Sequence, residues 1–84
     1  MEAYYFTFQS MTRAQEAAAL LRRYGLKTQL LRTPKAISGT GCGYALQLSP
    51  HDAYDGIFLL RNESVYPGKV YLLDQYNNGR EVIL

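Results

Sequence analysis

The residue best suited to chemistry is Cys42, the only cysteine of this 84-residue chain. It lies between Gly41 and Gly43 in the stretch ISGTGCGYAL. Glycines have no Cβ, so a reaction partner can approach the sulfur closely, and the backbone can adopt positive φ angles that point successive N–H groups at one anion. A thiol reacts as its thiolate, which requires access and nearby positive charge. The two glycines satisfy the first of these requirements.

Positive charge and hydroxyl donors precede Cys42 in the same connection. Arg32 and Lys35 supply the charge that would stabilise a thiolate, and Ser38 and Thr40 add hydroxyl groups. Free cysteines are nevertheless among the residues most often buried as small apolar side chains. A reactive and an inert cysteine therefore both remain open on these residues alone, although Cys42 precedes an apolar segment and does not belong to one.

Other kinds of active site find little support. His51 is the only histidine, and beside Asp52 and near Asp55 it suggests a metal or acid–base site. Helix capping explains the stretch SPHD more simply, and a structural metal site usually needs about four ligands. An enzyme that turns over a disulfide usually needs a second cysteine. We therefore expect no metal and no cofactor, and a non-enzymatic protein rather than a turnover enzyme.

The segments that must position Cys42 alternate between strand and helix patterns. Apolar residues at every second position indicate strands, and the spacing of Ala14, Ala17, Ala18 and Leu21 indicates an amphipathic helix. The sequence predicts strands over residues 3–8, 26–33, 44–49, 68–76 and 80–84, helices over 13–24 and 50–62, and a loop over 34–43.

Capping signals mark the ends of the first predicted helix. Thr12 and Gln15 have the spacing of a capping box, and Ser10 is a rival cap. Gly25 suits the left-handed residue that often follows a helix. The first helix should therefore begin near Thr12 and end just before Gly25.

Similar signals mark the second helix and the C-terminal turn. Ser49 is a candidate cap, Pro50 suits the first helical position, and Gly56 is an internal weak point costing up to ~1 kcal/mol relative to alanine. Asn78 and Gly79 favour a two-residue type I′ turn, which would pair the last two strands as a hairpin.

The order of these elements is that of an α+β ferredoxin-like βαββαβ two-layer sandwich with a C-terminal β-hairpin extension. We expect one domain over residues 1–84, with an arm over 74–84 attached to a core over 1–73. The formal charge of +2 is small and its positive residues are spread along the chain, so it does not by itself imply nucleic acid. No apolar stretch approaches the ~18 residues of a membrane span, and a lone cysteine without a secretion signal suggests a soluble cytoplasmic protein.

Two stretches carry a resemblance to a known family. TPKAISGTGCGYAL and the opening YYFTFQSMTRAQEAAALLRRYGLKTQLL resemble small bacterial proteins described as selenium or sulfur carrier-like, over residues 3 to about 73. The family segment is matched by Pro34, Lys35, Ser38, Cys42 and Gly43. Family members more often have serine at positions 39 and 41, and the arm after position 74 departs from the pattern.

The resemblance implies a function for the single thiol. Cys42 would accept sulfur or selenium from a donor enzyme as a persulfide or selenosulfide and pass it to an acceptor protein, with the surrounding residues as a binding loop.

Two alternatives remain. The first is a small non-enzymatic regulatory or interaction module that forms a homodimer through one face of the sheet, formed by Tyr5, Thr7, Lys27, Gln29, Ala45, Gln47 and Tyr71. The second is RNA binding with Tyr5 as a stacking aromatic. The strand over 44–49 lacks the aromatic pattern of RNA-recognition domains, so nucleic acid is not the expected partner.

Overall fold

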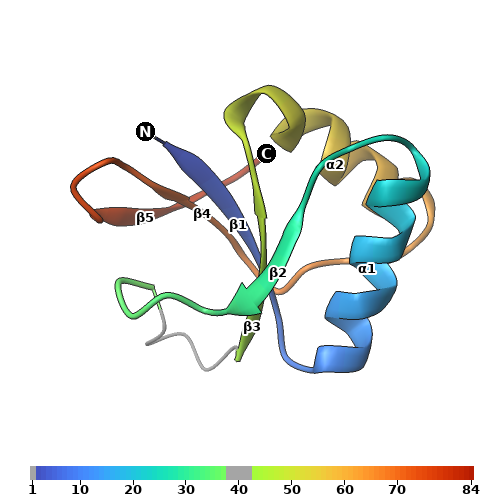
Figure 1. Cartoon of the computed structure of the whole chain (residues 1–84), viewed down its shortest axis with the longest axis horizontal. Coiled ribbons are helices and arrows are strands. Elements are labelled where there is room, and N and C mark those ends of the chain that lie inside the picture. The colour runs from blue at the N-terminus through green and yellow to red at the C-terminus, as the bar shows by residue number, and fades with distance from the viewer. Residues whose placement is uncertain (1, 38–42) are drawn as a thin grey trace.

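The protein is a five-stranded antiparallel sheet with two helices packed on one face (Figure 1). The computed structural model describes residues 2–37 and 43–84. The elements are β1 (Ala3–Phe8), α1 (Met11–Arg23), β2 (Gln29–Arg32), β3 (Tyr44–Leu48), α2 (Pro50–Asn62), β4 (Val70–Leu73) and β5 (Gly79–Val82). The strand order is β2-β3-β1-β4-β5, and each neighbouring pair is antiparallel. The expected ferredoxin-like sandwich with an additional C-terminal strand is confirmed.

The main core lies between the helices and the sheet. Alternate residues of β1 and β3 point toward the helices, and among them Phe6, Phe8, Leu46 and Leu48 are at most 2% exposed. Helix α1 covers them with alanines and with Leu21, and small side chains allow a helix to lie close to a sheet. The apolar spacing in the sequence therefore identified both the helix and the face that it buries.

The N-terminal end of α1 differs from the capping-box prediction. The cap is Ser10, whose hydroxyl accepts a hydrogen bond from the Arg13 backbone N–H at 3.1 Å, so the box centred on Thr12 is wrong. β1 ends at Phe8, and the chain turns into the helix within two residues, which brings Ser10 to the capping position.

The C-terminal end of α1 uses residues that were predicted to belong to the next strand, β2. Gly25 has the expected left-handed backbone, with φ at 84°. Its N–H donates to the Arg22 carbonyl, and the Leu26 N–H donates to the Leu21 carbonyl, at 3.0 Å each. These two bonds form a Schellman motif, so Leu26 completes the helix and β2 begins only at Gln29.

Helix α2 begins and ends where the sequence predicts, although two of its residues act differently. Ser49 is the capping residue, but its side chain makes no capping hydrogen bond. A Cβ at Gly56 would lie 2.8 Å from Leu48 Cδ2 and 3.4 Å from Phe6 Cε2. Gly56 is therefore required for the close approach of the helix to the sheet, which the interpretation as a weak point missed.

The C-terminal hairpin forms as expected, but its turn is not the two-residue type I′ turn. The loop runs from Asp74 to Asn78, with a positive φ at Asn77, and the Asp74 N–H donates to the Asn78 carbonyl at 3.1 Å. The Asp74 carboxylate accepts backbone N–H bonds from Tyr76 and Asn78 at 2.8 and 3.0 Å. Gly79 is the first residue of β5 and lies outside this turn. Within the part of the chain that the structure describes, neither helix is long and apolar enough to cross a membrane.

Candidate functional site

The candidate site is the connection between β2 and β3, which are neighbours in the sheet. Beyond the strand ends, the Thr33 N–H donates to the Gly43 carbonyl at 3.2 Å, so the ladder continues to the base of the connection. The structure places Pro34, Lys35 and Gly43 at this base. The predicted site residues Ser38, Gly41 and Cys42 lie outside the described residues.

Ile37 fixes the first part of the connection. Its N–H donates to the Pro34 carbonyl at 3.0 Å, which closes a tight turn, and the residue is 4% exposed. Its side chain belongs to a second apolar cluster with Tyr5, Ala45 and Tyr71, on the face of the sheet that the helices leave open. In Figure 1 this segment, drawn in green after β2, runs away from the helices on the side where β5 lies. Sequence reasoning did not identify Ile37, because an isolated isoleucine in a loop carries no periodic signal.

The C-terminal hairpin contacts Ile37 directly. A Cβ at Gly79 would lie 2.5 Å from Ile37 Cγ2 and 3.1 Å from Leu73 Cδ1. Any residue other than glycine at position 79 would therefore displace the Ile37 side chain from its position above the start of β5. The arm thus helps to form the base of the cysteine connection.

The central residues of the face that suggested a dimer or an RNA platform are buried. Tyr5 and Tyr71, which face each other in the β1–β4 register, are 8% and 7% exposed, and Thr7 and Ala45 are fully buried. Burial raises the pKa of the Tyr5 phenol. Stacking of a base on Tyr5 would require the covering residues to move. Of the other residues of the expected dimer face, Lys27 and Gln29 are exposed and Gln47 is half-buried.

The base of the connection carries positive charge. The Arg32 guanidinium lies 5.7 Å from the centre of the Tyr44 ring, within the range of a cation–π contact, and Lys35 is exposed. Tyr44 pairs with Phe8, so α1 begins at the same end of the sheet, and its first turn contains no acidic residue. A helix N-terminus carries partial positive charge, which adds to that of the side chains.

Gly43 and Thr33 are two further residues at the base of the connection. Among the residues that the structure describes, none would lie within 4 Å of a Cβ at Gly43, and the φ of Gly43 is not positive. The Thr33 hydroxyl oxygen is buried and has no hydrogen-bond partner among the residues that the structure describes. Gly43 therefore does not adopt the positive φ that glycine permits.

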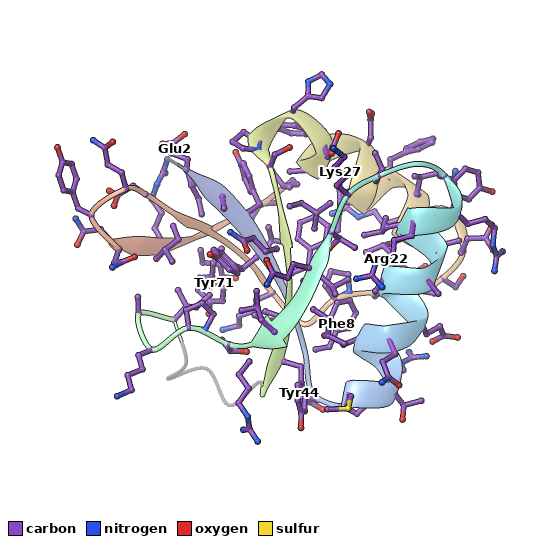
Figure 2. The ribbon with its side chains drawn as sticks, viewed as in Figure 1. Glu2, Phe8, Arg22, Lys27, Tyr44 and Tyr71 are labelled. Carbon is purple, nitrogen blue, oxygen red and sulfur yellow. The ribbon has the colours of Figure 1, made fainter. Side chains whose placement is uncertain are left out.

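A cavity of about 520 Å³ lies at the other end of the sheet. It is lined by Glu2, Ala3, Lys27, Thr28, Gln29, Gln47, Leu48, Ser49 and Pro50. Figure 2 shows Glu2 and Lys27 at this end and Phe8 and Tyr44 at the opposite end. Of the predicted site residues that the structure describes, which are Pro34, Lys35 and Gly43, none lines this cavity. Across residues 2–37 and 43–84, no three His, Cys, Asp or Glu side chains gather as a metal site would require.

A match to a known protein family shows to which family the chain belongs. Residues 3–72 match the family described as "Putative Se/S carrier protein-like". The chain belongs to this family. The matched region runs from β1 into β4 and includes the whole β2–β3 connection, whereas β5 lies outside it. No curated protein and no solved structure matches the chain.

Proposed function

We propose that this family member carries sulfur or selenium on the thiol of Cys42. The observation that carries the proposal is the family match, which includes the segment containing the chain's single cysteine. The positive charge at the base of the connection, from Arg32 and Lys35, supports it, because positive charge favours the reactive thiolate. Among the described residues, none would lie within 4 Å of a Cβ at Gly43, which supports access by a partner.

The loading step is a thiol exchange that needs no external oxidant. The Cys42 thiolate attacks the terminal sulfur of a persulfide on a donor enzyme, a new S–S bond forms, and the donor cysteine leaves as its thiolate. Delivery reverses the roles, since an acceptor nucleophile takes the terminal sulfur and the Cys42 thiolate leaves. A terminal selenium atom would follow the same path. One cysteine suffices for both steps.

Intact-mass spectrometry tests the proposal. The protein is incubated with a cysteine desulfurase and L-cysteine, and we expect a mass increase of one sulfur atom that a reducing thiol removes. Cys42→Ser is the control, because it keeps the size of the side chain but cannot hold a terminal sulfur. An unmodified protein, or an equal increase in the variant, would contradict the carrier function and favour a non-enzymatic interaction module.

Native-state alkylation tests whether the thiol is reactive. We expect iodoacetamide to modify native Cys42 near neutral pH at least as fast as it modifies a free thiol, whose pKa is about 8.5. Lys35→Ala should slow the reaction without abolishing it, because it removes positive charge and keeps the nucleophile. A thiol that reacts only in denaturant would be buried, and the carrier proposal would be falsified.

A further inference from the structure

The charges of the chain are strongly segregated. No Asp or Glu occurs over residues 17–51, which hold five of the nine cationic side chains, while all seven acidic residues lie outside. The cations of this stretch are Arg22, Arg23, Lys27, Arg32 and Lys35. In the fold, the stretch comprises the second half of α1, β2, β3 and the connection between them.

Three of these cations follow the edge strand β2 along its length. Arg22 Nη2 donates to the Thr28 carbonyl at 3.0 Å, which holds the guanidinium beside the start of the strand, and the exposed Lys27 precedes it. Arg32 is the last residue of β2 and lies over Tyr44. Figure 2 shows Lys27 at one end of β2, Arg22 beside the strand and Tyr44 at the other end. The two ion pairs recorded among the described residues lie elsewhere, at Arg13–Glu16 and Lys69–Glu81.

The backbone of β2 offers an open edge along this row of cations. The bond from the Thr33 N–H to the Gly43 carbonyl fixes the alternation of the antiparallel ladder. By that alternation Leu31 bonds inward to β3, and the N–H and C=O groups of Leu30 and Arg32 point outward from the sheet. β2 is the last strand on this side of the sheet. An additional strand could therefore pair with it through these groups.

We propose that the β2 edge is a docking site for an acidic, extended segment of a partner protein, which adds to the sheet as a strand. Backbone bonds would supply affinity and the cations would select acidic side chains. A second copy is disfavoured because two β2 edges would bring like charges together. The edge groups suit a peptide backbone rather than phosphates, which favours a protein over a nucleic acid.

The β2 edge lies next to the proposed carrier site. The biological purpose of docking at this edge rests on the proposed carrier function. β2 leads directly into the connection that begins at Pro34, so a docked segment would end beside it. A donor or acceptor bound in this way would be held near the chain segment that contains Cys42.

The test is an NMR titration of the labelled protein with a capped peptide of alternating glutamate and threonine, roughly eight residues long, within the usual range of strand lengths. We expect shift changes centred on the amides of Leu30 and Arg32, and weaker binding at high salt. A peptide with glutamine in place of glutamate should bind at least about tenfold more weakly. A peptide N-methylated on its pairing amides keeps the charge and should also lose binding.

Matched charge reversals on the two sheet edges locate the surface. Lys27→Glu should raise Kd at least about tenfold, whereas Arg80→Glu on the other edge strand, β5, should change it less than about twofold. Absence of shifts at β2, equal effects of the two variants, or equal binding of the N-methylated peptide would overturn the proposal. So would tighter binding of a uridine oligonucleotide at the same edge. Sulfur loading of Cys42, measured separately by mass, distinguishes a failure of docking from a failure of the carrier function.

Discussion

At the scale of single residues, Gly79 and Gly43 occupy opposite environments around the cysteine connection. A Cβ at Gly79 would overlap Ile37, whereas a Cβ at Gly43 would have no neighbour within 4 Å among the residues that the structure describes. Overpacking of this kind costs about 1–3 kcal/mol. We expect Gly79→Ala to lower the free energy of unfolding by that amount in urea denaturation, and Gly43→Ala to change it by less than about 0.5 kcal/mol. A destabilised Gly43→Ala beside an unaffected Gly79→Ala would contradict the proposed role of Ile37.

From the sequence we could identify residues whose type indicates reactivity, but not residues whose role is packing. Cys42, Lys35 and Gly43 could be selected because a lone thiol, a cation and a glycine have recognisable properties. The pairing of Ile37 with Gly79 could not be predicted, because it joins opposite halves of the chain through a loop without periodicity. A glycine in the sequence likewise does not settle the backbone conformation, since Gly43 has no positive φ although glycine permits one.

At the scale of elements, the two helices end in the same way with different residues. α2 ends in a Schellman motif like that of α1, in which the Ser64 and Val65 N–H groups donate to the Arg61 and Leu60 carbonyls. Ser64 occupies the left-handed position with φ at 58°, where α1 has glycine. An L residue pays roughly 1 kcal/mol or more for that conformation.

Ser64→Gly should therefore stabilise the protein by roughly 0.5–1 kcal/mol, because glycine adopts the left-handed conformation without the Cβ penalty. Gly25→Ala in α1 is the reciprocal variant and should destabilise it by a similar amount. Thermal and urea denaturation of both variants provide the measurement. A Ser64→Gly variant less stable than the wild type would show that the serine side chain contributes an interaction of its own.

The β4–β5 turn makes stability depend on pH. The backbone N–H groups of Asn78 and Tyr76 lower the pKa of the Asp74 carboxyl below its ordinary value. A carboxyl with a lowered folded-state pKa stabilises the fold above its unfolded pKa, and this contribution is lost as the pH falls through the folded pKa. Asp74→Asn keeps an acceptor oxygen and removes the charge, so it should reduce the loss of stability between neutral and acidic pH.

Urea denaturation from pH 7 down to about pH 3, below the ordinary carboxyl range, measures this effect. Asp55→Asn, an exposed carboxylate on α2, controls for the loss of one negative charge. An acid-dependent loss of stability that is the same in Asp74→Asn and the wild type would show that the turn does not contribute to it.

Element type was predictable throughout, and element boundaries were predictable where a side chain fixed them. Pro50 and the alternation of β1 gave correct starts. β2 began late because Leu26 is used by the helix cap, and the last turn was wider because Asp74 organises it. In both cases hydrogen bonds of backbone N–H groups determined the boundary, to a backbone carbonyl at the helix end and to the Asp74 carboxylate in the turn, and the alternation of apolar residues does not indicate such bonds.

At the scale of the whole molecule, the C-terminal arm lies outside the family match yet contributes to both faces of the sheet. Val82 and Leu84 pack against the main core, and Gly79 lies under Ile37 on the other face. Arg61 Nη2 also donates to the Leu84 carbonyl at 2.6 Å. The region that matches the family, residues 3–72, nevertheless contains both helices and the three strands of the β2-β3-β1 arrangement.

Deletion of residues 77–84 should therefore leave a folded protein of lower stability. The loss of β5 exposes the edge of β4 and removes Gly79, against which Ile37 packs. We therefore expect an unchanged helical circular dichroism signal, a lower urea midpoint and stronger self-association. Ile83→Ser, at a side chain that is 95% exposed, is the control and should behave as the wild type. Complete unfolding of the truncated protein would show that the arm is an indispensable part of the core, and an unchanged midpoint would show that its contacts with Ile37 and the main core contribute nothing to stability.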